Sequence, residues 1–149
     1  MSNTDLIIQL SPASAAAARE VRRDSPFRRA RTCYDHLAGV AGVELIDALH
    51  HKGWLEEQGK SKSRTHYRLT PMGAQGLTVR GVDLSLVHGS KRIYAYGCTD
   101  WTERQFHLGG ALGAAILRSL VEAGIVRRDY GTRVVGRLEP VQQWIDNMA

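Results

Sequence analysis

One pattern returns along the chain at a constant distance, and it limits the folds that the chain can adopt. Residues of the first half recur 71 positions later, with His36, Gly39, Gly42, Gly53 and Trp54 corresponding to His107, Gly110, Gly113, Gly124 and Ile125. Cys33 and Cys98 lie 65 positions apart, because the segment WTERQF is inserted after Asp100 in the second copy. Such constant spacing indicates the duplication of one supersecondary unit.

The first copy reads as a helix followed by a hairpin and a second helix. Leu45, Ile46 and Leu49 lie on one helical face, and Gly53 follows as a C-cap glycine would. The segments WLEEQ and THYRLT predict two short strands on either side of the polar tip GKSKSR. Pro71 then falls in the first turn of a further helix.

The second copy repeats this order. Its helix ends near Gly124, and the segment IVRRDYGTRVVGRL predicts a hairpin with its turn at Tyr130-Gly131. The segment EPVQQWI closes the copy. The apolar face of the helix is formed by Leu112, Ile116, Leu117, Leu120 and Val121.

The sequence therefore predicts an α+β fold of tandem, duplicated winged-helix-like units behind an N-terminal helix. The 149 residues suit one compact domain or two very small ones. The expected divisions are an N-terminal helix and basic linker (1–30), a first repeat (31–80), a connector (81–97) and a second repeat (98–149).

The basic composition favours an anionic binding partner. The formal charge is +5 and the isoelectric point is about 9.6, which places nucleic acid first among the partner classes. No secretory signal and no apolar run long enough for a membrane span is present. We therefore expect a cytoplasmic protein without a membrane partner, with both thiols reduced.

Basic residues gather in an arm and in the first hairpin, where they could reach the phosphate backbone of DNA. Glu44 and Asp47, exposed positions of the preceding helix, face phosphates unfavourably and speak against groove reading. The predicted DNA-contacting residues are Arg28, Arg29 and Arg31 of the arm, Lys60, Lys62 and Arg64 of the hairpin tip, and His66 and Arg68 of the following strand.

Cysteine and histidine recur in both copies and raise the question of a metal site. Cys33, His36, Cys98 and His107 could form a Cys2His2 zinc site if the copies pack about a pseudo-twofold axis. Cys33 and His36, three residues apart, would share a face of a helix. Asp35 and Asp100 could then orient the two imidazoles.

A structural role for the same residues is the favoured alternative. The spacing from cysteine to histidine is three in one copy and nine in the other, which does not favour a shared ligand geometry. Cysteine packs as a small apolar group, and Asp is a good N-cap. We therefore expect no cofactor, with zinc as the one alternative that the sequence leaves open.

Other thiol chemistry is also open. A disulfide between Cys33 and Cys98 can be drawn, but a reducing cytosol disfavours it, and either thiol could act as a sensor. Cys33 with His36 or His107 is also the inventory of a thiol hydrolase, yet no nucleophile elbow or phosphate-binding loop accompanies it. We expect no enzyme. The inserted WTERQF could form a lid or one wall of an effector site.

The paired motifs carry a family likeness. RARTCYDHLAG together with CTDWTERQFHLGGALGAAIL resembles the C-terminal part of ArsR-type winged-helix transcriptional regulators of bacteria, over about residues 28–145. Those regulators generally carry a DNA-binding domain ahead of this region, and the first 27 residues here are too short for one. Their metal-sensing motif belongs to that missing domain, so the resemblance implies no metal ligands in this chain.

The resulting hypothesis is a transcription-regulator-type protein that contacts DNA through its basic wing and arm. The alternative is an effector-sensing or dimerisation module that binds a small ligand or a metal and no DNA. In either case we expect a homodimer, formed through the alanine-rich N-terminal helix.

Overall fold

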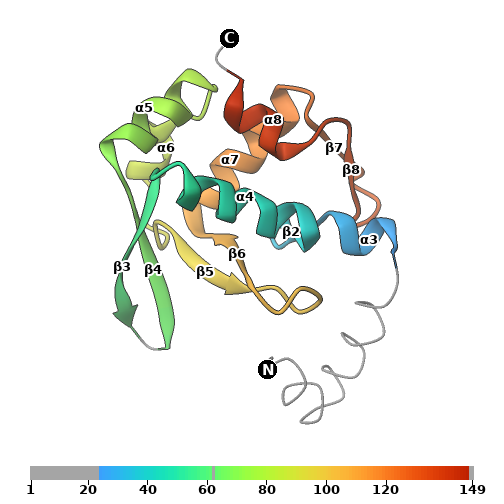
Figure 1. The fold of residues 1–149 in the computed structure, drawn as a ribbon, viewed down its shortest axis with the longest axis horizontal. Helices are drawn as coiled ribbons and strands as arrows, with labels where there is room; N and C mark the ends of the chain where they lie inside the picture. Colours follow the sequence, from blue (N-terminus) through green and yellow to red (C-terminus); the bar gives the residue numbers. More distant parts are fainter. Residues whose placement is uncertain (1–23, 62, 148–149) are drawn as a thin grey trace.

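The computed structural model describes residues 24–61 and 63–147 and has a mixed α+β architecture (Figure 1). The helices are α3 (Pro26–Arg29), α4 (Gly39–His51), α5 (Pro71–Val79), α6 (Leu84–His88), α7 (Gly110–Glu122) and α8 (Val141–Asp146). The strands are β1 (Arg31–Cys33), β2 (His36–Ala38), β3 (Leu55–Ser61), β4 (Arg64–Leu69), β5 (Tyr96–Thr99), β6 (Phe106–Gly109), β7 (Val126–Arg128) and β8 (Val135–Arg137). The predicted N-terminal helix falls largely on residues 1–23, outside the described residues.

The order hairpin, helix, hairpin, helix occurs twice along the chain. Hairpin β1–β2, helix α4, hairpin β3–β4 and helix α5 are followed, after α6, by hairpin β5–β6, helix α7, hairpin β7–β8 and helix α8. Within the described residues, the predicted helices and the β3–β4 and β7–β8 hairpins are present. The hairpin ahead of each long helix differs from the prediction, in which His36 lies in the helix itself.

The long helices α4 and α7 lie at the centre of the molecule, one behind the other in the view of Figure 1. The apolar face predicted for α4 is buried, and so is that of α7 except for Val121, which is half-buried. Gly53 and Gly124 follow the two helices with φ of +73° and +75°. These values confirm the predicted C-terminal glycines, since a left-handed residue closes a helix most easily when it lacks a Cβ.

The two halves pack as one body around one core. Strands β3, β4, β5 and β6 form an antiparallel sheet in which His66 of β4 pairs with Tyr96 of β5. On the other side Arg31 of β1 pairs with Val134 next to β8. The hairpin that follows each long helix thus pairs with the leading hairpin of the other half. Residues from 31–80 and from 98–149 accordingly share a single buried cluster.

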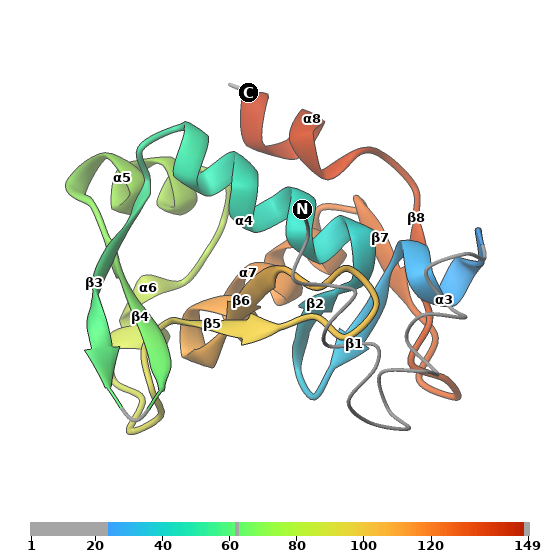
Figure 2. The same cartoon turned by 60° about the horizontal axis from the view of Figure 1, so that its bottom comes forward.

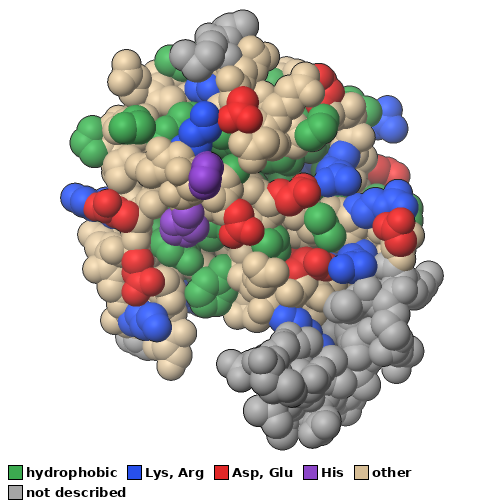
Figure 3. All heavy atoms as spheres, in the orientation of Figure 1, with side chains coloured by type: hydrophobic (Ala, Val, Ile, Leu, Met, Phe, Trp, Pro, Cys, Tyr) green, Lys and Arg blue, Asp and Glu red, His purple; other side chains and the backbone are tan. Residues whose placement is uncertain are grey.

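The β3–β4 hairpin projects from this body (Figures 1 and 2). Beyond Leu55 every described residue of β3 is exposed. On the face shown in Figure 3, acidic and basic side chains are interspersed and form no patch of one sign. Among the described residues, no helix has the length and apolar content that crossing a bilayer requires.

Candidate metal centre

Two β-hairpins from the two halves bring the four repeated cysteine and histidine side chains together. Cys33 pairs with His36 across β1–β2, and Cys98 pairs with His107 across β5–β6. The interpretation of Cys33 and His36 as neighbours on a helix face is therefore wrong, because they face each other across a tight turn. Each hairpin supplies one sulfur and one imidazole to a common point.

The pairing also removes the objection based on spacing. Cross-strand neighbours are set by the register of the hairpin, and the length of the loop between them does not matter. In β1–β2 the loop is Tyr34-Asp35, whereas in β5–β6 the inserted segment lengthens the loop. A spacing of three and a spacing of nine therefore give the same Cys–His pair.

The distances within the cluster fit a tetrahedral ion. The Sγ atoms of Cys33 and Cys98 are 3.9 Å apart, and the Nε2 atoms of His36 and His107 are 3.1 Å apart. In a tetrahedral zinc site with bonds of about 2.3 Å to sulfur and about 2.0–2.1 Å to nitrogen, these edges are about 3.8 and 3.3 Å. All four candidate ligand atoms lie within 4.8 Å of one another, so small side-chain rotations would complete the site.

Glycines in the two long helices permit this approach. A Cβ at Gly42 of α4 would lie 3.2 Å from the Cβ of His107, and one at Gly113 of α7 would lie 3.2 Å from the Cβ of His36. The same added atoms would lie 2.5 and 2.4 Å from the carbonyl oxygens of Leu37 and Leu108. Each long helix therefore packs directly against the histidine of the opposite hairpin, and no larger residue fits at these contacts.

His107 is held by the carboxylate of Asp100, which is fully buried. His107 Nδ1 lies 2.8 Å from Asp100 Oδ2, which also accepts the backbone N–H of Gly39 at 2.6 Å. Arg31 donates to the other carboxylate oxygen at 2.8 Å. A carboxylate can only accept, so His107 donates its Nδ1 proton, and its Nε2 faces the cluster. This is how histidine ligands are usually oriented by carboxylates.

The loop inserted into the second copy completes this arrangement. Thr102 donates to Asp100 through its backbone N–H at 3.2 Å and its hydroxyl at 3.0 Å, and the N–H of Glu103 donates at 3.1 Å. WTERQF was predicted as a lid or a wall of an effector site. In the structure it supplies donors to the carboxylate behind His107, and its role as a lid or wall of an effector site stays a prediction.

His36 is held more loosely. Its Nδ1 lies 3.6 Å from the nearer oxygen of Asp35, beyond a good hydrogen bond, and has no hydrogen-bond partner among the described residues. Asp35 instead binds Arg92 at 2.6 Å. The Nε2 atoms of His36 and His107 lie 3.1 Å apart, so in the metal-free state one of them carries the proton of a hydrogen bond between the two rings. An ion at the cluster would require that proton to leave, because both Nε2 lone pairs would face the ion.

The polar groups of the cluster shift one another's protonation. Hydrogen bonds from Cys98, His107 and His36 hold the pKa of the Cys33 thiol far below its usual range. The hydrogen bond to Cys33, together with burial, raises the pKa of Cys98. Burial alone would lower the pKa of His107, but its hydrogen bonds to Asp100 and Cys33 raise it. One thiolate is thus already favoured without an ion, and thiolate is the form that binds metals.

One side of the cluster is buried in the core, and the other side is partly exposed to solvent. The side chains of His36 and His107 are each 2% exposed, whereas Cys33 and Cys98 are half-buried and free. The imidazoles therefore approach an ion from the core and the sulfurs from the surface, which gives the ion a path of entry.

The arm residues predicted to contact DNA are engaged within the protein. The assignment of Arg31 is wrong: it is completely buried, it pairs with Asp100, and its guanidinium lies 4.8 Å from the ring centre of Phe27. Arg28 pairs with Glu103 at 3.0 Å, and Arg29 pairs with Asp24 at 2.7 Å. The high density of arginine in this segment partly reflects internal ion pairs, and Arg31 supports the carboxylate behind His107.

The predicted wing residues lie on the projecting hairpin. Lys60 is exposed, and Lys62 lies outside the described residues. Arg64 is exposed and stacks over the ring of Tyr96 at 4.3 Å. His66 is half-buried, and Arg68 pairs with Glu56. The basic tip is thus more accessible than the strand that follows it.

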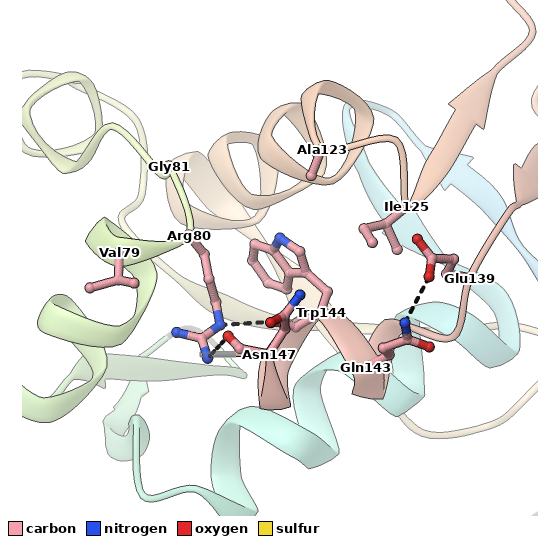
Figure 4. A pocket seen from close by; sticks show the side chains of 9 residues that line it. All are labelled: Val79, Arg80, Gly81, Ala123, Ile125, Glu139, Gln143, Trp144 and Asn147. Atoms are coloured by element: carbon pink, nitrogen blue, oxygen red, sulfur yellow. Dashed lines mark hydrogen bonds between the residues drawn. The ribbon is translucent and has the colours of Figure 1, made fainter. Parts of the chain in front are cut away.

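A separate cavity of about 400 Å³ lies beside α8 (Figure 4). Arg80 points into it, but its guanidinium donates to the carbonyl oxygens of Trp144, Ile145 and Asn147 at 2.9, 2.5 and 2.7 Å. These contacts fasten the C-terminal end of α8 to the body and occupy the donors that an anion would need. The cluster of Cys33, His36, Cys98 and His107 is therefore the better candidate for a functional site.

Comparison with known proteins agrees with a regulatory context. The chain is 36% identical over 123 residues, or 81% of its length, to the uncharacterized HTH-type transcriptional regulator YdfF of Bacillus subtilis (strain 168). The matched part is 52% of that protein, so the chain spans about half the length of the curated relative. No protein-family model matches the chain, and no solved structure matches it.

Proposed function

We propose that this chain is the metal-binding part of a transcription-regulator-type protein, and that Cys33, His36, Cys98 and His107 together hold one ion of the zinc class. The observation that carries the proposal is the placement of two sulfurs and two imidazole nitrogens within 4.8 Å of one another. The regulatory half of the proposal is supported by the similarity to YdfF.

The ligand set favours a particular chemistry. Two thiolates with two imidazoles suit zinc and other borderline or soft ions, whereas magnesium and calcium prefer oxygen. Four protein ligands also fill a tetrahedral coordination sphere and leave no position for a substrate. The proposed ion is therefore structural or regulatory, and we propose no enzymatic activity for this chain.

An ion at this place would join the two halves of the molecule. Each half contributes one Cys–His hairpin, and each long helix packs on the histidine of the other half through Gly42 or Gly113. Binding to the native state alone raises its stability in proportion to the logarithm of the ion concentration above the dissociation constant. Metal occupancy would therefore tighten the contact between the halves, which is the change that a regulator could transmit.

We also infer that the two halves arose by duplication of a winged-helix-like unit. Helices α4 and α7 begin 71 positions apart, as do β3 and β7 and also β4 and β8. The reciprocal contacts of Gly42 with His107 and of Gly113 with His36 support the same inference. A metal site on the axis between two such copies would use one ligand pair from each.

The metal proposal is tested by titrating the reduced chain with Co²⁺ and Zn²⁺. We expect one ion per chain, a thiolate-to-cobalt charge-transfer band and the intense visible bands of tetrahedral cobalt. Cys98→Ser and His36→Ala should weaken binding strongly, because each removes one ligand. His51→Ala, which changes an exposed histidine of α4, is the matched control and should bind normally. Absence of the charge-transfer band in the parent protein would refute the proposal.

A second candidate function rests on the projecting β3–β4 hairpin. We propose that Lys60, Lys62 and Arg64 at its tip contact the phosphate backbone of DNA. The exposure of Lys60 and Arg64 and the projection of the hairpin support this function. Arg31 contributes no phosphate contact in this proposal, because it is fully buried and paired with Asp100.

The DNA proposal is tested by duplex binding at several salt concentrations. Three phosphate contacts predict a slope of log affinity against log salt of about −2.7. The triple variant Lys60→Ala/Lys62→Ala/Arg64→Ala should lose this dependence. The variant Arg127→Ala/Arg137→Ala on the other hairpin is the control and should keep it. A parent protein that binds no duplex at low salt would exclude DNA contact by this part of the regulator.

A further inference from the structure

The two sulfurs of the metal cluster lie close enough together to react with each other. Cys33 Sγ and Cys98 Sγ are 3.9 Å apart, and one thiol donates a hydrogen bond to the other. A disulfide needs a separation of about 2.05 Å, so the sulfurs must approach by about 1.9 Å. Rotation of two side chains can supply much of that movement, because both lie on short strands at the half-exposed edge of the cluster.

The surroundings of the sulfurs admit a small reactant from solvent. Both cysteines are half-buried, while the two histidines behind them are almost fully buried. Tyr34, at the turn between Cys33 and His36, is 84% exposed and does not cover the pair. A reagent that reaches the cluster therefore meets sulfur before nitrogen.

We propose that Cys33 and Cys98 are a site of reversible oxidation by hydroperoxides, and that closing their disulfide expels the metal ion. The metal-release step rests on the proposed function, whereas disulfide formation does not. The oxidised pair offers no thiolate, so two of the four ligands are lost and only His36 and His107 remain. The fraction of chains that hold an ion then depends on both the metal concentration and the hydroperoxide concentration.

The reaction balances with hydrogen peroxide as the oxidant. One thiolate attacks a peroxide oxygen, the O–O bond breaks, and the departing hydroxide takes a proton to become water. The attacking sulfur is now a sulfenic acid, oxidised by two electrons. The second sulfur attacks it, the S–S bond forms, and hydroxide leaves with the thiol proton as a second water. Two thiols and one peroxide thus give one disulfide and two waters.

The test uses the full chain, metal-free or loaded with one equivalent of Zn²⁺, treated with hydrogen peroxide. In the metal-free protein we expect both free thiols to be lost together and the mass of the monomer to fall by two hydrogens. In the loaded protein, zinc should appear in a chromophoric chelator in step with loss of the thiols. A thiol reductant should restore both thiols and zinc binding.

The controls separate this inference from the metal proposal. Cys33→Ser and Cys98→Ser should each abolish the intramolecular disulfide, and circular dichroism reports whether they are folded. If zinc binds the parent but peroxide yields sulfinic acids or intermolecular disulfides, the redox inference is overturned and the metal proposal stands. If the disulfide forms but zinc does not bind, the metal proposal and the release step fall, and the oxidation site stands.

Discussion

The two hairpins that supply the candidate ligands differ in how they hold their histidines. In β5–β6, Asp100 is buried, pairs with Arg31 and fixes the ring of His107 at 2.8 Å. In β1–β2, Asp35 is partly exposed, and it stands 3.6 Å from His36. The backbone pairing is the same in both hairpins, and the insertion accounts for the difference, since its N–H and hydroxyl groups solvate the buried carboxylate.

Because of this difference, one half of the candidate site is preorganised and the other is adaptable. A ligand whose orientation is fixed before binding loses less conformational freedom when the ion arrives. His107 meets this condition because its tautomer and ring orientation are set by Asp100. Among the described residues, His36 has no partner at Nδ1 that fixes its ring, and it must gain one. We therefore expect the β5–β6 half to dominate stability and affinity.

The largest expected effect is on folding. Asp100→Ala leaves Arg31 buried without its carboxylate and should lower the free energy of unfolding by about 3–5 kcal/mol. Asp35→Ala removes a partly exposed pair with Arg92 and should cost at most about 1 kcal/mol. Urea denaturation of the reduced proteins in chelator measures both. Equal losses would contradict the asymmetry between the hairpins.

The next effect is on metal affinity. Asp100→Asn keeps the shape of the side chain but weakens the orienting hydrogen bond to His107, and zinc binding should weaken by about 10–100-fold. Asp35→Asn should weaken binding by less than about tenfold, since its contact with His36 is long. Competition with a chromophoric chelator gives both constants. A larger loss at Asp35 would reverse the assignment of the preorganised half.

The glycine contacts should show no asymmetry. Gly42→Ala and Gly113→Ala each place a Cβ within 2.5 Å of a backbone carbonyl oxygen. Each should destabilise the protein by about 1–3 kcal/mol, despite the better helix propensity of alanine. Gly136→Ala in β8, whose nearest atom would be 3.7 Å away, is the control and should change stability by less than about 0.5 kcal/mol. If the midpoints of thermal denaturation of Gly42→Ala and Gly113→Ala differ clearly, the packing of the two helices on the histidines is unequal as well.

The smallest effect should come from Arg92. Arg92→Ala removes the exposed ion pair with Asp35 and should cost at most about 1 kcal/mol of stability. The freed carboxylate can then turn toward His36, so zinc affinity should stay the same or rise. A clear fall in zinc affinity would mean that Arg92 positions Asp35 for the ion, and β1–β2 would then be less adaptable than we propose.

Much of the secondary structure could be predicted because it follows local rules. The faces of α4 and α7 have helical periodicity, and Gly53, Gly124 and Pro71 mark helix ends. The leading hairpins escaped prediction because their turns lack the usual glycine. Tyr34 occupies φ of +59° in a two-residue turn without Asn-Gly or Asp-Gly, so nothing local distinguished a strand at His36 from the start of a helix.

Local patterns were also insufficient to predict how the candidate site is assembled. The repeated Cys and His identified the four candidate ligands, but the meeting of the hairpins depends on contacts such as Gly42 with His107, which join distant parts of the chain. The partners of Arg28 and Arg31 were hidden for the same reason. Arg31 and Asp100 are 69 residues apart, and a charge run alone does not reveal which arginine is buried.

X-ray absorption spectroscopy at the zinc edge of the reduced, zinc-loaded chain is the most direct test of the central claim. We expect two sulfurs at about 2.3 Å and two imidazole nitrogens at about 2.0–2.1 Å. The Cys98→Ser variant should lose one of the two sulfurs. A zinc ion surrounded by oxygen and nitrogen alone, or one that the chain fails to retain, would contradict the assignment of Cys33, His36, Cys98 and His107 as a metal centre.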